Sequence, residues 1–587
     1  MSSMDSTWKN RYTGPAPKIP EVAQLAERLE ISPSFASLLW QRGFQELDDM
    51  SRFLSPNLRN LAPLSQWPDF VNSAEKLAKG LDEGRSLLVW GDYDVDGITS
   101  TALVKDFLAF HGYNVRHHIP NRLKSAYGLN AEVLEQLAAE GVTLLLTVDC
   151  GISDIAQVKR AKELGMTVII SDHHLPGEEL PEADAICNPR LGPCPCPALA
   201  GVGVAFLLMA ALNVIFGERG RPKADMRDYL DLVALGTLAD VVELTGQNRI
   251  LAKNGLFTHT GAGHTIANGK RPGIAALKSV CNQSPTAVLE AGQVVYMLAP
   301  RINAAGRMGQ SDLAVELMLT HDRDRAAHLA SELNALNLAR REEEKQIMAE
   351  ALEQAQKQAE EGRIGLVLHG ENWHPGIIGI VASRIVETLH RPAIVLCSER
   401  GAIKGSGRSV TDFDLHAALT ACADLFIAFG GHKQAAGVTL PEERLDEFAK
   451  RFDMLVAEGL GGKISPPAVS IDAELDFDLA KDIEFLKELE LLHPFGPGNP
   501  EPVFLSPPVT VKSVQMRNGG LNLTEFTHKE SGVTLRGKTW RAHAALPPDM
   551  KGKTVRLAYT PHIDRYNGVA SVELKLRAWK PATEEKS

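Results

Sequence analysis

The stretch LLVWGDYDVDGITSTALVKDFLAF (residues 87–110) places Asp92, Asp94 and Asp96 between an apolar run and a helix-prone segment. Four apolar residues followed by an amphipathic stretch are typical of a buried strand that leads into a helix. Three carboxylates within five residues repel one another, and their pKa values rise unless a cation neutralises them. The stretch therefore predicts a βα unit whose turn holds a divalent cation. Taken alone, DYDVDG also fits an acidic turn or a calcium-binding loop.

The alternation of strand and helix patterns continues to about residue 190. Apolar runs at 142–148 and 166–170 alternate with amphipathic stretches that end in glycine, which predicts βαβ units and a parallel sheet. Because the carboxyl ends of parallel strands lie along one edge of an open sheet, polar residues after these runs are expected to converge. Those residues are Asp92, Asp94, Asp96, Asp149, Asp172, His173 and His174.

A further carboxylate, Asp240, interrupts the apolar helix pattern LDLVALGTLADVVEL (230–244). Burying a lone carboxylate is strongly unfavourable, so we expect Asp240 to join the same cation site. Aspartates together with histidines supply oxygen and nitrogen ligands that suit Mn²⁺ or Mg²⁺. Their number allows two ions about 4 Å apart, an arrangement suited to phosphodiester hydrolysis.

Length and charge limit the class of protein. A chain of 587 residues is too long for one hydrophobic core, so several domains are expected. The formal net charge of −11 argues against a surface coated in nucleic acid, yet it leaves a local basic groove open. The N-terminus MSSMDSTWKN has no apolar segment for secretion, which predicts a cytoplasmic protein.

The seven cysteines do not form a disulfide framework, and reduced thiols are expected. Three of them, Cys187, Cys194 and Cys196, lie close together in CNPRLGPCPCP (187–197). The density of prolines there favours a loop, with a zinc site of three thiolates as the alternative.

The segment ALAGVGVAFLLMAALNVIFG (198–217) is apolar and long enough to span a membrane. It lacks basic flanks, and a single span would separate the Asp and His motifs before it from Asp240 after it. A buried core helix is therefore expected.

The rest of the chain predicts further domains. Residues 321–362 show the periodicity of one long helix with a charged surface, and an α/β pattern restarts after it. GGKISPP looks like a linker, and the alternating runs in the last 120 or so residues predict a small β-barrel. The expected segments are 1–65 (N-terminal helical extension), 66–320 (catalytic domain), 321–362 (connecting helix), 363–462 (second α/β domain) and 463–587 (barrel).

The motifs GDYDVDG, TVDCG, SDHH and LGTLADVV, in this order and spacing, resemble the DHH phosphoesterase superfamily. FGGHKQAAG (429–437) is similar to the glycine-rich substrate motif of the DHH-associated domain. Within the superfamily, the chain most resembles the bacterial single-strand-specific 5′-to-3′ DNA exonucleases. The resemblance implies a multidomain α/β fold: a parallel-sheet DHH domain, a long helix, a smaller α/β DHH-associated domain and a C-terminal barrel like the oligonucleotide-binding (OB) fold.

The resemblance also implies roles for individual residues. Asp92 and His174 belong to the catalytic site, either as further ligands or as groups that orient water and the scissile phosphate. Asp149 is expected to bridge two Mn²⁺ or Mg²⁺ ions. The implied metal ligands are Asp94, Asp96, Asp149, His173 and Asp240. The implied substrate-binding residues are His432, Arg122, Arg307, Ser406 and Arg408.

An arginine fork suits a terminal phosphate because it binds two oxygens at once, although a surface salt bridge is the alternative for each arginine. In the barrel, Trp540, Tyr559, Tyr566 and Arg565 are candidates for stacking on single strands, with barrel core or rim as the alternative. A narrow groove between the two α/β domains would admit single strands and exclude duplex DNA.

The implied function is metal-dependent release of 5′ mononucleotides from single-stranded DNA in recombination and repair, including mismatch repair. A DHH-type phosphatase or short-oligonucleotide RNase shares the metal site, but those relatives are shorter and lack the barrel. A scaffold protein would have lost ligands, and a Rossmann-type nucleotide-binding module would carry G-x-G-x-x-G after the first strand. The implied partners of this monomer are single-stranded DNA, single-stranded DNA-binding protein and a RecQ-type helicase.

Overall fold

The structure, a computed structural model, describes residues 7–13, 18–121, 128–257, 263–399, 401–464, 468–517, 520–540, 544–565 and 570–582. It consists of two compact units. One comprises Asn57–Ile464 with Gly496–Gly498, and the other comprises Met1–Pro56, Ser465–Phe495 and Asn499–Ser587.

The larger unit begins with a five-stranded sheet in which every pair of neighbouring strands is parallel, as predicted. The order is β3-β2-β4-β5-β6, so the chain moves to one side of β2 for β3 and to the other side for β4. Ligands bind at the carboxyl ends of strands where such a reversal occurs. The strands are β2 (Leu87–Gly91), β3 (Arg116–His118), β4 (Leu144–Val148), β5 (Thr167–Ser171) and β6 (Ala185–Cys187).

The short strand β6 is not predicted from the sequence, which instead begins a loop at Cys187. It is only three residues long, Ala-Ile-Cys, which is too short for a strand to be read from the sequence. It forms because the exposed edge of β5 pairs with it from Ile169 to Ser171.

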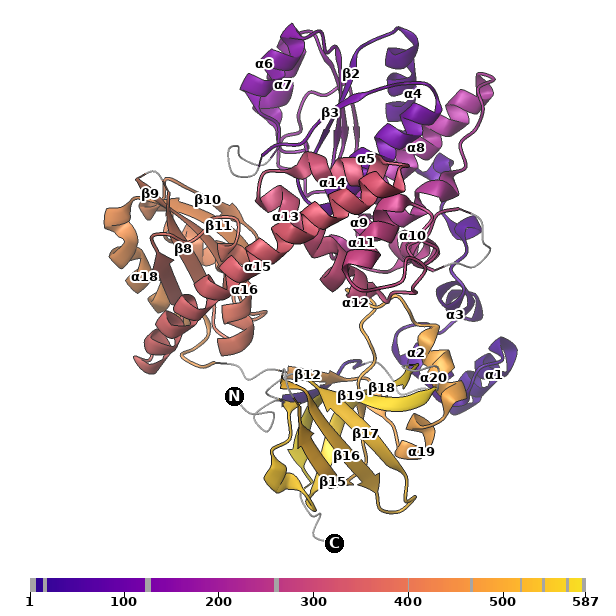
Figure 1. Cartoon of the computed structure of the whole chain (residues 1–587), viewed down its shortest axis with the longest axis vertical. Coiled ribbons are helices and arrows are strands. Elements are labelled where there is room, and N and C mark those ends of the chain that lie inside the picture. Colours follow the sequence, from indigo (N-terminus) through magenta and orange to yellow (C-terminus); the bar gives the residue numbers. More distant parts are fainter. Residues whose placement is uncertain are drawn as a thin grey trace. The chain divides into compact units, whose positions relative to one another are not determined.

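Both faces of this sheet are covered by helices (Figure 1). Side chains alternate across a strand, so Leu87 and Val89 face one core, and Leu88 and Trp90 face the other. The first core contains α4 (Pro68–Asp82), α5 (Val95–Phe110) and α8 (Gly201–Glu218), and the second contains α6 (Ala131–Ala139) and α7 (Ile155–Glu163).

Helix α8 is the apolar segment for which the sequence predicts a buried core helix, and the structure confirms that prediction. By length and composition it could cross a membrane, yet 72% of it is buried inside the unit. It packs on α4, α5 and α9 (Leu230–Ala239). Its apolar surface on all sides is therefore accounted for by core packing.

A buried ion-pair group ties the helical layer together. Arg271, at the start of α11 (Pro272–Val280), donates from Nε to Asp231 Oδ2 at 2.9 Å and from Nη1 to Asp106 Oδ2 at 3.0 Å. The side chains of Arg271 and Asp231 are 3% and 0% exposed. Because these charges are out of water, each depends on its partner.

The long helix α15 (Arg323–Glu360) occupies the segment where the sequence predicts one. Its first half packs in the core of the parallel sheet domain through Leu329 and Leu333. Its second half packs in another core through Ile347 and Ala351. One helix thus joins two hydrophobic cores of the larger unit (Figure 1).

The second sheet of this unit is mixed, with order β10-β11-β9-β8-β7. Strands β7 and β8 are parallel and the other pairs are antiparallel. Helices α16 (Ile378–Leu389) and α18 (Leu445–Gly459) accompany it. The strands are β7 (Leu366–Gly370), β8 (Ala393–Glu399), β9 (Ala402–Arg408), β10 (Ala428–Gly431) and β11 (Ala435–Leu440).

The smaller unit contains the predicted barrel. Strand pairing runs β15 to β16, β17, β19, β18 and back to β15, which closes a five-stranded ring. Closure removes the exposed strand edges. The ring consists of β15 (Val509–Met516), β16 (Asn522–His528), β17 (Thr534–Thr539), β18 (Thr554–Asp564) and β19 (Ser571–Pro581).

The N-terminal helices belong to the same unit as the barrel, although the sequence analysis treats them as a separate extension. They are α1 (Ile19–Leu29), α2 (Pro33–Gln41) and α3 (Leu47–Leu54). Their apolar side chains, such as Phe35 and Phe53, share a core with Phe526 and Leu557 of the barrel. Strand β1 (Thr7–Asn10) also pairs in parallel with β12 (Ala468–Ile471).

We predict that Asp231→Ala lowers the free energy of unfolding of the larger unit by about 3–5 kcal/mol, because it leaves the Arg271 charge buried with one partner fewer. Glu316→Ala is the matched control: its pair with Arg325 is exposed on both sides and contributes less than about 1 kcal/mol. Denaturant unfolding measures both variants. Equal shifts of the two midpoints would contradict the stabilising role of the buried group.

Candidate metal centre

Two of the three aspartates of the acidic turn bind backbone N–H groups at helix N-termini. Asp94 caps α5, since its Oδ1 accepts from the backbone N–H of Asp96 and of Gly97 at 2.9 and 3.1 Å. The buried Asp96 accepts from the N–H of Gly201 and Val202, at the start of α8, at 2.7 and 2.8 Å. Helix N-termini carry partial positive charge, so they stabilise carboxylates in this position.

Carboxylates from three different elements surround one nitrogen of His173. Its Nε2 lies 3.1 Å from Asp149 Oδ1, 3.6 Å from Asp240 Oδ2 and 3.9 Å from Asp96 Oδ2. Within the described residues this buried nitrogen makes no hydrogen bond. The residues that the sequence predicts to converge at the sheet edge are thus brought together.

Crowding and burial shift the protonation of these groups. Burial, followed by the charge of Asp94, raises the pKa of Asp96 to about 7. Burial, followed by the charge of Asp96, raises the pKa of Asp240 to about 9 and that of Asp149 well above its usual range. Burial also lowers the pKa of His173 to about 4, so its imidazole is neutral and suited to bind a cation. A divalent cation would relieve the carboxylate repulsion.

Asp172 organises the two histidines that follow it. Its Oδ1 accepts from the backbone N–H of His173 at 2.7 Å and lies 2.7 Å from Nδ1 of His174, and its Oδ2 accepts from the N–H of Ile152 at 3.0 Å. Burial opposes charge on both side chains, yet their mutual hydrogen bond lowers the pKa of Asp172 and raises that of His174 to about 9. His174 therefore carries a positive charge at neutral pH. No separate role for Asp172 is predicted from the sequence, although its place directly before two histidines is the available signal.

Three groups of side chains have ligand atoms within 4.8 Å of one another. Two of the groups share Asp149, which fits its predicted position between two ions. The buried Nε2 of His173 and its surrounding carboxylates form a donor set suited to Mn²⁺ or Mg²⁺. The groups are Asp149 with His173 and His174, Asp96 with His173 and Asp240, and Asp92 with Asp94 and Asp149.

The helix pattern over 230–244 is interrupted at Asp240 as predicted, but the helix is shorter than the pattern, because α9 ends at Ala239. The next residue but one, Val241, has φ 61°, a left-handed conformation that is strained for a β-branched side chain. Asp240 thus lies at a helix C-terminus, where partial negative charge disfavours a carboxylate. Asp149 is also left-handed, with φ 63°.

Two glycines that the sequence analysis assigned to apolar helices prove to make room for the carboxylates. A Cβ at Gly201 would lie 2.5 Å from Asp149 Oδ1, and a Cβ at Gly236 would lie 2.8 Å from Asp96 Oδ1. Glycine inside an apolar helical run was the available signal, since it often marks close approach.

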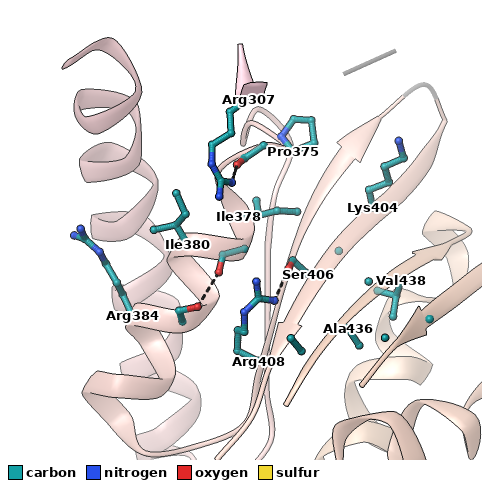
Figure 2. A pocket seen from close by; sticks show the side chains of 18 of the residues that line it. Arg307, Pro375, Ile378, Ile380, Arg384, Lys404, Ser406, Arg408, Ala436 and Val438 are labelled. Atoms are coloured by element: carbon teal, nitrogen blue, oxygen red, sulfur yellow. Dashed lines mark hydrogen bonds between the residues drawn. The ribbon is translucent and has the colours of Figure 1, made fainter. Parts of the chain in front are cut away.

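A cavity of about 1660 Å³ contains three of the predicted substrate residues, Arg307, Ser406 and Arg408 (Figure 2). Arg408 donates from Nη1 to Ser406 Oγ at 3.0 Å, and Arg307 donates from Nη1 to the carbonyl of Gly376 at 2.5 Å. Lys404 and the glycines of the FGGHKQAAG motif also line the cavity. The cavity wall is therefore basic, with backbone accessible at its glycines.

The remaining predicted substrate residues are placed differently. His432 is exposed in the turn between β10 and β11, directly after the lining residue Gly431. Strand register brings this motif beside GSGRS, with Gly437 opposite Ser406. Arg122 lies outside the described residues.

Helix α13 (Ala299–Arg307) connects the cavity to the acidic turn. A Cβ at Gly306 would lie 2.2 Å from the carbonyl oxygen of Tyr93, which stands between Asp92 and Asp94. Arg307, the next residue, lines the cavity. One helix thus touches the metal centre and contributes to the basic wall.

Among the barrel candidates, Tyr559 is wrong as a stacking residue: it is fully buried and its hydroxyl donates to the carbonyl of Leu475 at 2.8 Å. Arg565 donates to both carboxylate oxygens of Glu490, at 2.7 and 3.0 Å. Trp540 is exposed, with Lys538 Nζ 6.0 Å from its ring. Tyr566 lies outside the described residues.

The zinc alternative for the cysteine-rich segment finds no support in the part of the chain that the structure describes. Cys187 and Cys196 are buried and Cys194 is partly buried, and all three are free thiols. None belongs to a group of metal-ligand side chains there.

The parallel sheet, the carboxylate and histidine groups at its switch point and the second α/β domain define a DHH-type protein. Residues 86–237 match the DHH family N-terminal domain, residues 362–458 the DHHA1 domain and residues 471–578 the RecJ OB domain. The chain belongs to the RecJ family.

Relatives of known name are similar over nearly the whole chain. The single-stranded-DNA-specific exonuclease RecJ of Dickeya dadantii is 40% identical over 91% of this chain and 93% of its own length. RecJ of Escherichia coli is 37% identical over 95% of this chain and 97% of its own length. The crystal structure of Thermus thermophilus RecJ in complex with Mn²⁺ aligns with a TM-score of 0.82 and 31% identity, covering 99% of this chain and 80% of that one.

We predict that Gly201→Ala weakens Mn²⁺ binding about 10- to 100-fold, because the added methyl group displaces the Asp149 carboxylate that supports the ions. Titration calorimetry of the metal-free protein measures the affinity. Gly292→Ala is the control, since a Cβ there meets nothing within 4 Å. Unchanged Mn²⁺ affinity in Gly201→Ala would show that the close approach does not position the ligand.

We predict that the metal-free protein loses stability as pH rises from about 6.5 to about 9. The raised pKa values of Asp240 and His174 mean that the folded state binds more protons than the unfolded chain in this window, and Asp96 adds to the difference up to about pH 7, so ∂ΔG/∂pH is negative. Mn²⁺ competes with those protons, and its stabilisation therefore grows over the same window.

Thermal melting with EDTA and with Mn²⁺ across this range measures the effect. Asp240→Asn should make the upper part of the metal-free curve less steep, because it removes one of the two groups with a pKa of about 9. A metal-free protein whose melting temperature rises with pH would contradict the assignment.

Proposed function

We propose that the protein is a metal-dependent exonuclease that hydrolyses single-stranded DNA from the 5′ end and releases 5′ mononucleotides. The observation that carries the proposal is the link between the two sites. Helix α13 packs on the acidic turn and places Arg307 in the basic cavity. The named relatives, over more than nine-tenths of this chain, are single-stranded-DNA-specific exonucleases.

Asp94, Asp96, Asp149, His173 and Asp240 would hold Mn²⁺ or Mg²⁺, the ions present in the Thermus thermophilus RecJ structures. The three overlapping ligand groups, two of them sharing Asp149, support two neighbouring ions. Bound there, divalent ions supply Lewis acidity that polarises a phosphoryl oxygen and lowers the pKa of water.

The chain itself provides positive charge and orientation around the scissile phosphate. The hydrogen bond that His174 Nδ1 donates to Asp172 orients the imidazole and favours its protonated form, which would attract a phosphate oxygen. Asp92, in one ligand group with Asp94 and Asp149, either binds an ion directly or orients the attacking water.

The basic cavity accounts for the proposed 5′ polarity. Arg408 is held in place by Ser406, and Arg307 by the carbonyl of Gly376, so both forks are positioned before a ligand arrives. A terminal phosphate has an extra negative charge and three oxygens that suit such forks. Gly431, with φ 141°, lets the turn that carries His432 approach the phosphate closely.

The barrel supports the choice of a polynucleotide over a small phosphoester. It is a closed ring that presents an exposed Trp540 beside Lys538, a combination suited to base stacking and backbone contact. A small phosphoester offers no run of bases for this surface to bind, so the surface favours a polynucleotide substrate.

We further propose a cytoplasmic monomer that acts in DNA recombination and repair, including mismatch repair, with single-stranded DNA-binding protein and a RecQ-type helicase as partners. Family resemblance supports these assignments. The strict requirement for a single strand makes an activity that unwinds duplex DNA a natural supplier of substrate.

The test follows 5′-labelled and 3′-labelled single-stranded DNA, with duplex DNA and RNA controls, in Mn²⁺ or Mg²⁺. We expect immediate release of labelled mononucleotide only from the 5′ end of single-stranded DNA, and a loss of about 10³-fold or more in Asp149→Ala, which removes the bridging ligand. Release from the 3′ end first would contradict the polarity. Cleavage confined to dinucleotides or small phosphoesters would favour the phosphatase or RNase alternative.

A further inference from the structure

Tyr296 is a large side chain with no evident structural role. It is 82% exposed, the highest value among the exposed large apolar side chains in the described residues. Within that part of the chain its ring and hydroxyl make no hydrogen bond, ion pair or aromatic contact. A tyrosine so exposed buries little apolar area in the fold, so its ring is accessible to a ligand.

The backbone beneath Tyr296 is firmly anchored. The residue lies in a π-helical segment, η5 (Val294–Leu298), whose end residues are fully buried. Arg301 donates from Nη1 to the carbonyl of Met297 at 2.5 Å and from Nε to Asn334 of α15 at 3.0 Å. Inserted π turns are frequent at functional sites because they redirect a side chain without breaking the helix.

Tyr296 lines the same cavity as the basic residues. It comes from the segment that precedes α13, whereas Ser406 and Arg408 come from β9 of the second sheet. The cavity thus combines an aromatic ring on one element with positive charge and glycine backbone on another. Figure 2 shows the charged wall, with Arg408 beside Ser406 and Lys404 on the neighbouring part of β9.

We propose that Tyr296 is a base-stacking platform, which receives a nucleobase close to the 5′ end whose phosphate the basic wall binds. The inference rests on the proposed exonuclease function and names an additional residue that determines its substrate. An aromatic ring with only two rotatable side-chain bonds, on an anchored backbone, loses little entropy when a base stacks on it.

Stacking on Tyr296 has two consequences for specificity. Every base has a π-face, so Tyr296 would accept any of the four bases. A base can lie on the ring only after it has left its complementary strand, so the platform favours unpaired DNA. Tyr296 therefore contributes to binding of the strand and takes no part in cleavage at the metal centre.

The experiment measures binding of 5′-phosphorylated oligodeoxynucleotides by fluorescence anisotropy in an Asp149→Ala background, which prevents cleavage. In one series, a single abasic nucleotide replaces each of the first several positions from the 5′ end. Tyr296→Ala should weaken binding of the intact strand about 5- to 150-fold, the range of one lost base stack. Tyr296→Phe should bind the strand with the affinity of the protein that keeps Tyr296, because phenylalanine retains the aromatic ring.

The decisive result is non-additivity at one position. At the stacked position, the abasic nucleotide should weaken binding to the Tyr296 protein but cause no further loss in Tyr296→Ala. Equal losses at every position, or an unchanged affinity of Tyr296→Ala for the intact strand, would overturn the proposal.

Val288→Ala is the matched control, because Val288 is 68% exposed nearby and does not line the cavity. It should bind every strand as the unaltered protein does, and Tyr296→Ala should melt at the same temperature as that control. Failure of the proposed function is distinguishable: a protein with Tyr296 intact would then show no preference for 5′-phosphorylated single strands at all.

Discussion

Repulsion among buried carboxylates is the constraint around which the larger unit is organised. Asp96, Asp149 and Asp240 approach one imidazole nitrogen of His173 within 4 Å. Few arrangements of a polypeptide tolerate such charge density without a counter-ion. The protein offsets part of it with the N-terminus of α8, whose backbone N–H groups bind Asp96. The remainder requires cations, which explains why the same geometry defines a metal centre.

Strain and close packing gather at the same place. Asp149 and Val241 adopt left-handed backbone conformations, and Gly201 leaves space that any other residue would fill. Features of this kind persist only where surrounding structure holds them. Here the surrounding structure is a parallel sheet buried on both faces, which provides a rigid edge. The site lowers the stability of the metal-free fold, and binding of the ions would offset that loss.

On the proposed function, the cavity that would position DNA and the ions that would cleave it lie on different sheets that one helix connects. The basic cavity lies on the mixed sheet and its neighbouring helices, while the ions belong to the parallel sheet. Helix α13 contacts the acidic turn through Gly306 and the cavity through Arg307. A strand held by its terminal phosphate and, on our proposal, by a base on Tyr296 would be fixed relative to the ions. If the 5′ end is held at a fixed distance from the ions, each cleavage removes one nucleotide.

Sequence alone determined the local chemistry of this protein and the elements that carry it. Apolar runs followed by aspartates and histidines predicted strands whose polar ends meet, because the direction of parallel strands forces convergence. The same reasoning brought Asp149 and His173 together, and motif resemblance added Ser406 and Arg408. Tertiary structure decided what depends on distant contacts: the end of α9 before Asp240, the room beneath Asp149 at Gly201, Tyr559 in the barrel core, and the N-terminal helices on the barrel. Periodicity reports which face of an element is apolar, but it carries no information on which other element covers that face. Only the assembled fold could place Tyr296 in one cavity with Ser406 and Arg408, which lie about 110 residues away in the chain.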